Sequence, residues 1–329
     1  MRFRVLAHSV HGVPYSVNGV GIRDGRLLQV LRVFESGFVR VVLAALVALS
    51  TPASALVVEL TDAAPDRVER QRAWARGELP LPGTPDVATV DARLAAKGLA
   101  EGNAVFIRIF KAESELEVWM RKGNGFVLFE TYPICHWTGT LGPKIREGDK
   151  QSPEGFYSIT ARQTRHRGRW RKAFNLGFPN ALDQRLQRTG SYILLHGGCS
   201  STGCFAMTDP VLDEIYDLAQ AALTHGQQRV HIHVFPFRMT ERALTQHAGH
   251  PASGFWQDLK AGYDAFERAH VPPTVGICNQ RYVVRDGDPG TSGDPNGLAV
   301  HRAGSDGQCR ALQEQQAQQS ALPRSVRAR

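Results

Sequence analysis

A histidine and a cysteine stand eight residues apart near the middle of the chain, in the stretch SYILLHGGCSSTGCFAM at 191–207. His196 follows the apolar run 192–195, which predicts a short buried strand, and Cys204 follows Gly203 in a loop of small residues. A thiol beside an imidazole is the basic unit of cysteine nucleophilic catalysis, because the ring accepts the thiol proton and leaves a reactive thiolate. The pattern therefore predicts a catalytic pair, His196 and Cys204, at the end of a strand.

Other interpretations of the same residues stay open. A cysteine in an exported protein is ordinarily buried or disulfide-bonded, so Cys204 alone would be inert or paired with Cys199. Cys199 is interpreted as structural, and a redox-sensitive disulfide that masks Cys204 is the alternative. A zinc site from His196 and the two cysteines is disfavoured, since the C-x2-C pairs of structural zinc sites are absent from the sequence. We therefore expect no metal.

The N-terminal segment has the form of a secretory signal. Arg32 and Arg40 precede the apolar run 41–49, and small residues at 53–55 follow. The run is short of the roughly 20 apolar residues that a transmembrane helix needs. We expect export to the periplasm with cleavage after Ala55, and no stable membrane span afterwards; an uncleaved N-terminal anchor is the alternative.

The chain contains five cysteines, an odd number, which leaves one thiol over in an oxidising compartment. Position along the chain suggests pairing Cys278 with Cys309 and Cys135 with Cys199, which leaves Cys204 as the free thiol. The sequence alone leaves this pairing open.

Composition limits the classes of function. With 329 residues and 42% hydrophobic residues, the chain is long and apolar enough for a packed core. Of the net charge of +8, half lies in the first 55 residues, where six arginines face only two carboxylates. The rest shows no stripe of lysine and arginine interleaved with aromatic residues, so we expect no nucleic-acid partner.

Periodicity predicts a mainly β chain with a few helices, an α+β fold. Helices are expected near 90–97, from Asp209 and Pro210 to Gly226, and at 254–270, with Asp209 as the capping residue. Strands are expected at 104–110, 116–120, 126–134, 156–161, 230–234, 275–278 and 281–284. The predicted organisation is a signal region at 1–55, a lead-in segment at 56–102, a main domain at 103–238, an extension at 239–284 and a disordered tail at 285–329.

Two motifs together resemble a known family. HGGCSSTGC at 196–204 and LGPKIREGDKQSPEGFY at 141–157 are similar to the YkuD-type L,D-transpeptidase catalytic domain, most closely its YafK-like branch. The stretch GFWQDLKAGYDAFE at 254–267 is also similar to that branch. The resemblance implies that 103–238 is a YkuD-like β-sandwich catalytic domain with a helical C-terminal extension, which binds peptidoglycan stem peptides and uses no cofactor.

The resemblance also implies roles for single residues. Cys204 becomes the nucleophile, His196 its general base and acid, Gly197 the carbonyl that orients the imidazole, and Gly203 an oxyanion N–H donor. The implied substrate-binding residues are Ser201, Thr202, Tyr132, Lys144 and Glu154, together with Arg146 and Asp149. The alternative for each residue of the 141–157 loop is that it only closes the loop by hydrogen bonding.

Histidines and basic residues outside the motif leave further choices. His136 lines the cleft or lies in a surface loop. The alternating His231 and His233 are expected on a solvated strand face, with a metal site as the less favoured alternative. An arginine is the best clamp for a substrate carboxylate, and the basic run 162–172 offers several candidates.

Three features depart from the usual family pattern. Only seven residues separate the histidine from the cysteine, as in the YafK-like branch, Thr202 stands where His or Arg is usual, and Ala206 stands where many members have Arg or Asn.

The expected function is a peptidoglycan L,D-transpeptidase that acts through a cysteine thioester in cell-wall biogenesis and remodelling. One alternative is an amidase or endopeptidase that resolves the same thioester with water, for example releasing a wall-linked lipoprotein. The other is a non-catalytic peptidoglycan-binding module. The sequence fixes no oligomeric state.

Overall fold

The computed structural model describes residues 67–165, 168–287 and 299–300. All of them belong to one of the chain's two units, Val58–Arg329, and the other unit, Met1–Val57, lies outside them. The predicted signal region at 1–55 and most of the predicted tail at 285–329 therefore lie outside the described residues.

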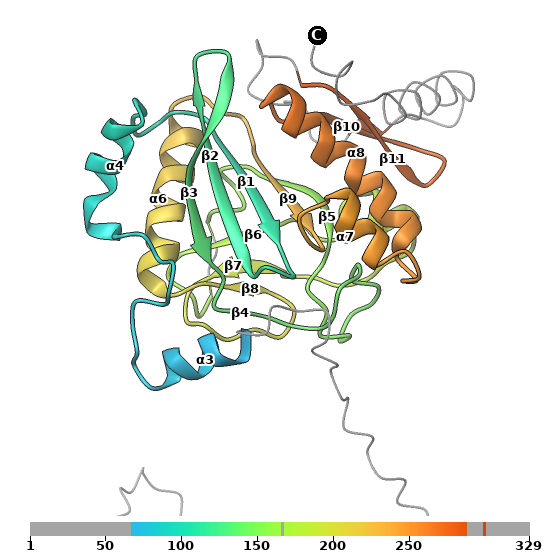
Figure 1. The fold of residues 1–329 in the computed structure, drawn as a ribbon, viewed down its shortest axis with the longest axis horizontal. Coiled ribbons are helices and arrows are strands. Elements are labelled where there is room, and N and C mark those ends of the chain that lie inside the picture. The colour runs from blue at the N-terminus through green and yellow to red at the C-terminus, as the bar shows by residue number, and fades with distance from the viewer. Residues whose placement is uncertain (1–66, 166–167, 288–298, 301–329) are drawn as a thin grey trace, which may run out of the picture. The chain divides into compact units, whose positions relative to one another are not determined.

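The main sheet has five strands in the order β3-β2-β1-β9-β5 (Figure 1). Strands β1, β2 and β3 form an antiparallel meander, while β9 runs parallel to β1 and antiparallel to β5. The strands are Val105–Phe110 (β1), Glu115–Lys122 (β2), Gly125–Pro133 (β3), Gly155–Ile159 (β5) and Val230–Phe235 (β9). The strands predicted in these five places are confirmed, with bounds that differ by one or two residues.

Alternate residues of a strand point to opposite faces of a sheet. Each face of this sheet packs against a helix. Ile107 and Ile109 of β1 belong to the large core cluster that also contains the apolar residues of α6 (Asp209–Thr224). Phe106, on the opposite face, packs against Phe266 of α8 (Ser253–Ala269) at a ring-centroid distance of 4.7 Å. Figure 1 shows α6 and α8 on the two sides of the sheet.

Two smaller sheets complete the described part. The second sheet has the order β4-β8-β7-β6 and consists of His136–Trp137 (β4), Phe205–Ala206 (β8), Leu194–His196 (β7) and Ala173–Asn175 (β6). The third has the order β11-β10-β12, formed by Arg281–Arg285 (β11), Thr274–Cys278 (β10) and Ala299–Val300 (β12). The strand predicted from Tyr192 begins only at Leu194, because Tyr192 has a left-handed backbone with φ of 52°.

The remaining helices are short: Arg67–Ala75 (α3), the 3-10 turn Val87–Thr89 (η2), Val90–Ala96 (α4), Ala181–Arg185 (α5) and Glu241–Gln246 (α7). Helix α6 starts as predicted, but its N-cap is Thr208, so Asp209 lies in the first turn and is not the cap. Mixed sheets with a few helices confirm the α+β class. Within the described ranges, no helix is long and apolar enough to cross a bilayer.

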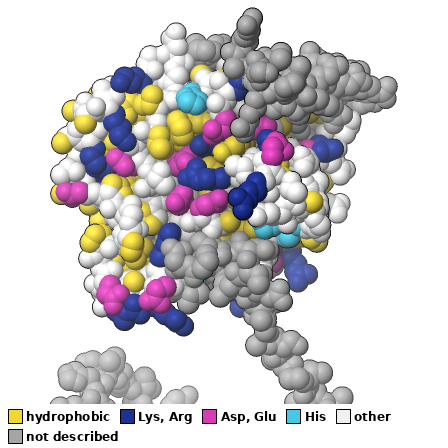
Figure 2. Space-filling view, in the orientation of Figure 1, with side chains coloured by type: hydrophobic (Ala, Val, Ile, Leu, Met, Phe, Trp, Pro, Cys, Tyr) yellow, Lys and Arg dark blue, Asp and Glu magenta, His cyan; other side chains and the backbone are white. Residues whose placement is uncertain are grey.

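The expectation of a solvated face at His231 and His233 is wrong. Their side chains are only 8% and 1% exposed. Strand β9 lies inside the sheet, between β1 and β5. Both histidines lie on the face of Phe106, which packs against Phe266 of α8 in the extension. On the face of the molecule in Figure 2, basic and acidic side chains are interspersed.

Candidate active site

The second sheet places His196 and Cys204 next to each other. Strands β7 and β8 are parallel, with Leu195 opposite Phe205 and His196 opposite Ala206. This register puts Cys204 opposite Leu194, two positions from His196 and on the same face, because side chains alternate along a strand. Diagonal neighbours of this kind are within reach of long side chains. The strand pairing, rather than the loop alone, sets His196 and Cys204 two positions apart on one face.

The connection between these strands is unusually short. Parallel strands normally need a dozen or more residues to connect, whereas only 197–204 join β7 to β8. Three residues of the loop adopt left-handed backbone, Gly198, Cys199 and Gly203, with φ of 78°, 48° and 119°. The repeated small residues of the motif are thus what the turn geometry requires.

His196 is fixed on two sides. Its Nδ1–H donates to the carbonyl of Gly197 at 2.5 Å, which leaves the lone pair on Nε2 as the proton acceptor. Its ring stacks on Trp170 with a centroid distance of 4.3 Å and an interplanar angle of 15°. Gly198 allows this stacking, because a Cβ at that position would lie 2.2 Å from the indole. The imidazole is held in one tautomer and one plane.

Cys204 is a half-buried free thiol. Its Sγ accepts the N–H of Leu194 at 3.4 Å and lies 3.7 Å from the carbonyl oxygen of Tyr192. Burial raises the pKa of the Cys204 thiol, while the Leu194 N–H and the positive charge of Lys144 act to lower it. A proton acceptor such as His196 is therefore needed to form the thiolate near neutral pH.

The predicted oxyanion donor is engaged in the loop itself. The N–H of Gly203 donates to Ser201 Oγ at 3.2 Å, and that hydroxyl donates to the carbonyl of Cys204 at 2.7 Å. Ser152, from the 141–157 motif, donates to the same carbonyl at 3.1 Å. The two sequence motifs thus meet at the backbone of Cys204.

Lys144 lies close to this centre. It is 3% exposed and its Nζ donates to the carbonyl of Arg146 at 2.9 Å and forms an ion pair with Asp149. The Asp149 carboxylate also accepts backbone N–H groups of the loop, among them that of Gln151 at 3.0 Å. Lys144 therefore has two roles: its ion pair with Asp149 closes the loop, and its positive charge lowers the pKa of the Cys204 thiol.

The structure does not bring two of the predicted substrate-binding residues to the thiol. Tyr132 is fully buried in β3, and its hydroxyl donates to Glu214 of α6 at 2.5 Å. Glu154 is fully buried in an ion pair with Lys111 at 2.9 Å and accepts the indole N–H of Trp256 at 2.7 Å. Both side chains hold elements together. Thr202, in contrast, is exposed on the loop.

A disulfide joins Cys135 and Cys199, whose Cα atoms are 5.2 Å apart, so the pairing suggested from position agrees with the structure. It ties the 197–204 loop to the residue before β4. Cys278 is also disulfide-bonded, and its predicted partner Cys309 lies outside the described residues.

The lead-in segment contributes to this region. Trp74 of α3 packs against the cluster that contains both bridged cysteines, and Arg70 donates to the carbonyl of Ser114 at 2.7 Å. His136, on β4, accepts the N–H of Ser201 at 3.2 Å, so it supports the loop. Helix α3 was not predicted from the sequence, and three of its residues, Glu69, Arg72 and Ala75, are exposed.

Sequence reasoning also missed Trp170, which lies in the basic run 162–172. Two neighbours anchor that run to α6: Arg171 pairs with Asp213 at 2.8 Å and Lys172 with Asp217 at 2.7 Å. The guanidinium of Arg169 lies over the Trp170 ring at 4.7 Å. Trp170 could have been noticed in the sequence because it is an aromatic residue within a basic run.

In the described residues, no group of three or more metal-ligating side chains is assembled.

Comparison with known proteins places this geometry in a family. Residues 104–232 match the family model of the YkuD L,D-transpeptidase catalytic domain. The chain is 45% identical over 183 residues to the protein named "Putative L,D-transpeptidase YafK" in Escherichia coli K12 and in strain O157:H7, which is 56% of this chain and 74% of the relative. The chain belongs to the YkuD family of L,D-transpeptidases.

Two solved structures are also similar to this chain, at lower sequence identity. The cell shape determining protein Pgp2 of Campylobacter jejuni is 19% identical with a TM-score of 0.31, over 56% of this chain and 66% of that one. Bd1075 of Bdellovibrio bacteriovorus is 20% identical with a TM-score of 0.30, over 50% of this chain and 60% of that one. The chain thus spans somewhat less than two thirds of either.

Proposed function

We propose that this protein is a cysteine-dependent peptidoglycan L,D-transpeptidase of cell-wall biogenesis and remodelling, with Cys204 as nucleophile and His196 as general base and acid. Family membership supports the reaction class. The observation that supports the residue assignment is a free thiol on the same strand-pair face as an imidazole whose Nδ1–H donates to the Gly197 carbonyl. Nothing in this mechanism requires a cofactor.

The proposed reaction has two halves. His196 Nε2 accepts the Cys204 proton, the thiolate attacks the peptide carbonyl next to diaminopimelate, and the C–N bond breaks as His196 returns the proton to the leaving amine. A thioester remains on Cys204. An acceptor amine then attacks this thioester, a new C–N bond forms, the C–S bond breaks, and the thiol regains its proton.

The carbonyl oxygen becomes negative in both halves and needs hydrogen-bond donors. Gly203 N–H serves this role when Ser201 Oγ, its partner at 3.2 Å, turns away as substrate binds. Ser201 and the exposed Thr202 then lie at the substrate side of the loop. Of the predicted binding residues, Lys144 supplies positive charge near the thiol, while Tyr132 and Glu154 are buried structural groups.

Arg169 is the best candidate to hold the substrate carboxylate. Arg171 and Lys172 are already paired with α6 carboxylates, whereas Arg169 stacks on Trp170, which itself stacks on His196. Arg169 is thus connected to His196 through the Trp170 indole, and a guanidinium binds a carboxylate through two parallel hydrogen bonds.

Hydrolysis is the second candidate function, with water resolving the same thioester. Ala206, which is opposite His196 in the strand pair, is fully buried and offers no polar group to hold a second peptide, and this favours water as acceptor. The substrate would then be a crosslinked stem peptide or a wall-linked lipoprotein.

A product analysis separates these functions. Purified protein is incubated with tetrapeptide muropeptides and, separately, with crosslinked and lipoprotein-bearing muropeptides, and products are identified by mass spectrometry. New crosslinks support transpeptidation and loss of crosslinks or lipoprotein supports hydrolysis. If no substrate gives a product, the proposal is contradicted and a non-catalytic peptidoglycan-binding module is the alternative that remains.

We also propose that the protein is exported to the periplasm. The Cys135–Cys199 disulfide supports an oxidising compartment, in agreement with the signal-like segment at 1–55. N-terminal sequencing of the protein purified from its native host tests this: a chain that starts at Leu56 is expected, and one that starts upstream of the apolar run would contradict cleavage. The catalytic domain is proposed to span 103–238, followed by the extension at 239–284.

A further inference from the structure

A buried ion pair lies beneath the loop that carries the second sequence motif. Lys111 follows β1 and Glu154 precedes β5, both side chains are 0% exposed, and Nζ lies 2.9 Å from Oε1. A buried ion pair is rarely a net source of stability, because the cost of removing two charges from water offsets their attraction. The other partners of the two side chains indicate a positioning role.

The ion pair ties the two ends of the 141–157 loop together. The ammonium group of Lys111 also donates to the carbonyls of Gly142 at 2.9 Å and of Ser152 at 3.0 Å. Glu154 Oε1 accepts the N–H of Gly142 at 2.6 Å, across twelve positions of sequence. Both ends of the loop are therefore attached to the end of β1.

Ser152 connects this attachment to the nucleophile. Its hydroxyl accepts the N–H of Thr138 at 3.1 Å and donates to the carbonyl of Cys204 at 3.1 Å. This bond fixes the peptide plane that follows Cys204. From the other side, Cys204 Sγ accepts the N–H of Leu194 at 3.4 Å, which lowers the pKa of the thiol. A shift of the Cys204 backbone would therefore weaken the bond between Sγ and the Leu194 N–H.

Trp256 joins the C-terminal extension to the ion pair. It lies in α8, is 0% exposed, and donates its indole N–H to Glu154 Oε2 at 2.7 Å. Both oxygens of the Glu154 carboxylate are then hydrogen-bonded. A continuous series of printed contacts thus runs from α8 through Glu154, Lys111 and Ser152 to the backbone of Cys204.

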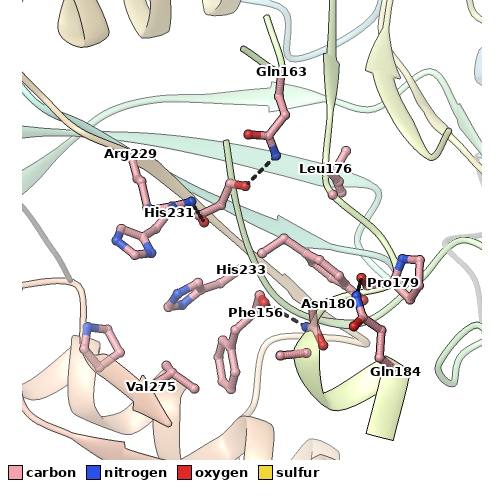
Figure 3. A pocket seen from close by; sticks show the side chains of 15 residues that line it. Phe156, Gln163, Leu176, Pro179, Asn180, Gln184, Arg229, His231, His233 and Val275 are labelled. Carbon is pink, nitrogen blue, oxygen red and sulfur yellow. Dashed lines mark hydrogen bonds between the residues drawn. The ribbon is translucent and has the colours of Figure 1, made fainter. Parts of the chain in front are cut away.

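The strand that follows the loop has contacts of its own. The carbonyl of Phe156, in β5, accepts Asn180 Nδ2 at 2.9 Å (Figure 3). The Phe156 ring also lies against α8 at Gly262, where a Cβ would be 2.4 Å from the ring. Strand β5 and α8 are therefore packed together independently of the indole bond, and that bond is left to act on the loop.

We propose that Lys111, Glu154 and Trp256 form a positioning cluster, through which the C-terminal extension holds Ser152 against the backbone of Cys204. None of the three touches the thiol. They act by keeping Cys204 Sγ at the Leu194 N–H, and this role rests on the proposed function of Cys204 as the nucleophile.

Trp256→Phe tests the cluster, because it removes the indole N–H and keeps an aromatic ring. We expect acylation of Cys204 by a tetrapeptide muropeptide, followed by intact-protein mass spectrometry, to slow about tenfold, the size expected for one buried hydrogen bond to a charged group. We also expect the midpoint of iodoacetamide alkylation at Cys204 to move to higher pH, because the thiolate loses part of its bond to the Leu194 N–H.

Trp119→Phe is the matched control. It removes an indole bond of the same length, 2.7 Å to Glu117, and Trp119 also packs on α8, against Phe266. Because Glu117 is not connected to the 141–157 loop by a printed contact, the control should change neither the acylation rate nor the alkylation midpoint. Urea denaturation of both variants separates a loss of stability from a loss of positioning.

A double-mutant cycle tests whether the effect passes through Ser152. Ser152→Ala alone should slow acylation about tenfold, and Trp256→Phe/Ser152→Ala should be no slower than the slower single variant, because both break one series of contacts. If Trp256→Phe proves unstable in urea, Glu154→Gln, which keeps the side-chain volume and removes the charge, replaces it with the same expectation.

Two results would overturn the positioning cluster: a Trp256→Phe variant with the acylation rate and alkylation midpoint of Trp119→Phe, or independent effects that slow the double variant about a hundredfold. The alkylation measurement needs no peptidoglycan, so it tests the cluster by itself. Absence of acylation in the wild type would contradict the proposed function and not the cluster.

Discussion

His196 depends on Trp170 for its orientation, in addition to the Gly197 carbonyl. The indole covers one face of the imidazole at a centroid distance of 4.3 Å and Gly198 makes room for it. Trp170→Ala is expected to lower kcat/KM about a hundredfold, because misplacement of a catalytic group by about 1 Å has an effect of that size. Trp170→Phe retains a flat ring and should keep most of the activity.

A pH profile distinguishes positioning from simple loss of packing. In Trp170→Ala, the acidic limb of kcat/KM should shift, since the imidazole has lost the ring that covers it, whereas Trp170→Phe should keep the wild-type limb. An unchanged limb together with unchanged kcat/KM in Trp170→Ala would contradict the positioning role.

Lys144 acts on the nucleophile through its charge. Its ammonium lowers the pKa of the Cys204 thiol, against the larger effect of burial. Lys144→Met should therefore move the midpoint of iodoacetamide alkylation at Cys204 to higher pH, and Lys144→Arg should not. Because the methionine leaves Asp149 without its ion-pair partner, Asp149→Asn is the matched control. Coincident midpoints in all four proteins would rule out the charge effect.

At the scale of elements, the active site depends on how the loop 197–204 is attached. The Cys135–Cys199 disulfide ties the loop to β4, and the N–H of Cys199 donates to the carbonyl of Met207 at 3.1 Å. With a sequence separation of 64, loss of the bridge is expected to cost about 4 kcal/mol of unfolding free energy by the chain-entropy model.

The double variant Cys135→Ala/Cys199→Ala tests this attachment by urea denaturation. It keeps the disulfide of Cys278 intact, which treatment with a reductant would not. We expect the loss of stability together with reduced turnover, because the loop backbone loses its anchor. Full turnover and a change in stability below about 0.5 kcal/mol would mean that the hydrogen bonds alone hold the loop.

The elements that local pattern specifies were predictable. Alternation and β-branched residues marked β1, β2, β3 and β9, and helical spacing with Pro210 marked α6. Elements that depend on tertiary contact were not: α3 has a charged sequence, and β4, β6 and β8 are only two or three residues long. Such short strands form because a neighbouring strand supplies their hydrogen bonds, which no local pattern encodes.

The same distinction holds for the site. Cys204 and His196 were identified because their spacing belongs to one continuous stretch. Trp170 and Ser152 approach them from other parts of the chain, and the burial of Tyr132 and Glu154 depends on α6 and α8, which pack over them from distant positions. Contacts between residues so far apart in sequence could not be derived from spacing.

For the whole molecule, His233 gives a measurable pH dependence of stability. Burial, His231 and Arg108 lower its pKa in the folded state, while the unfolded chain has the ordinary value of about 6.5. As pH falls below that value, the unfolded state gains a proton that the folded state does not bind. Stability due to this group is therefore complete above about pH 6.5 and declines by up to about 1.4 kcal/mol per pH unit below it.

Urea denaturation of wild type and His233→Phe at several pH values between about 7.5 and 5 isolates this effect. Phenylalanine fits the surrounding aromatic contacts with Phe106 and Phe156 and does not titrate. Burial raises the pKa of Asp183 and Asp258, which acts in the opposite direction, but equally in both proteins. If the unfolding free energies of the two proteins change with pH in the same way, His233 is not responsible for the pH dependence of stability.

The central claim is that Cys204 carries the acyl group during the reaction. Intact-protein mass spectrometry of acid-quenched mixtures of the protein with a tetrapeptide muropeptide tests it most directly. We predict an adduct with the mass of the acyl portion of the donor, located at Cys204 by peptide mapping, and neither adduct nor product with Cys204→Ala. Product formation by Cys204→Ala at the wild-type rate would contradict the mechanism.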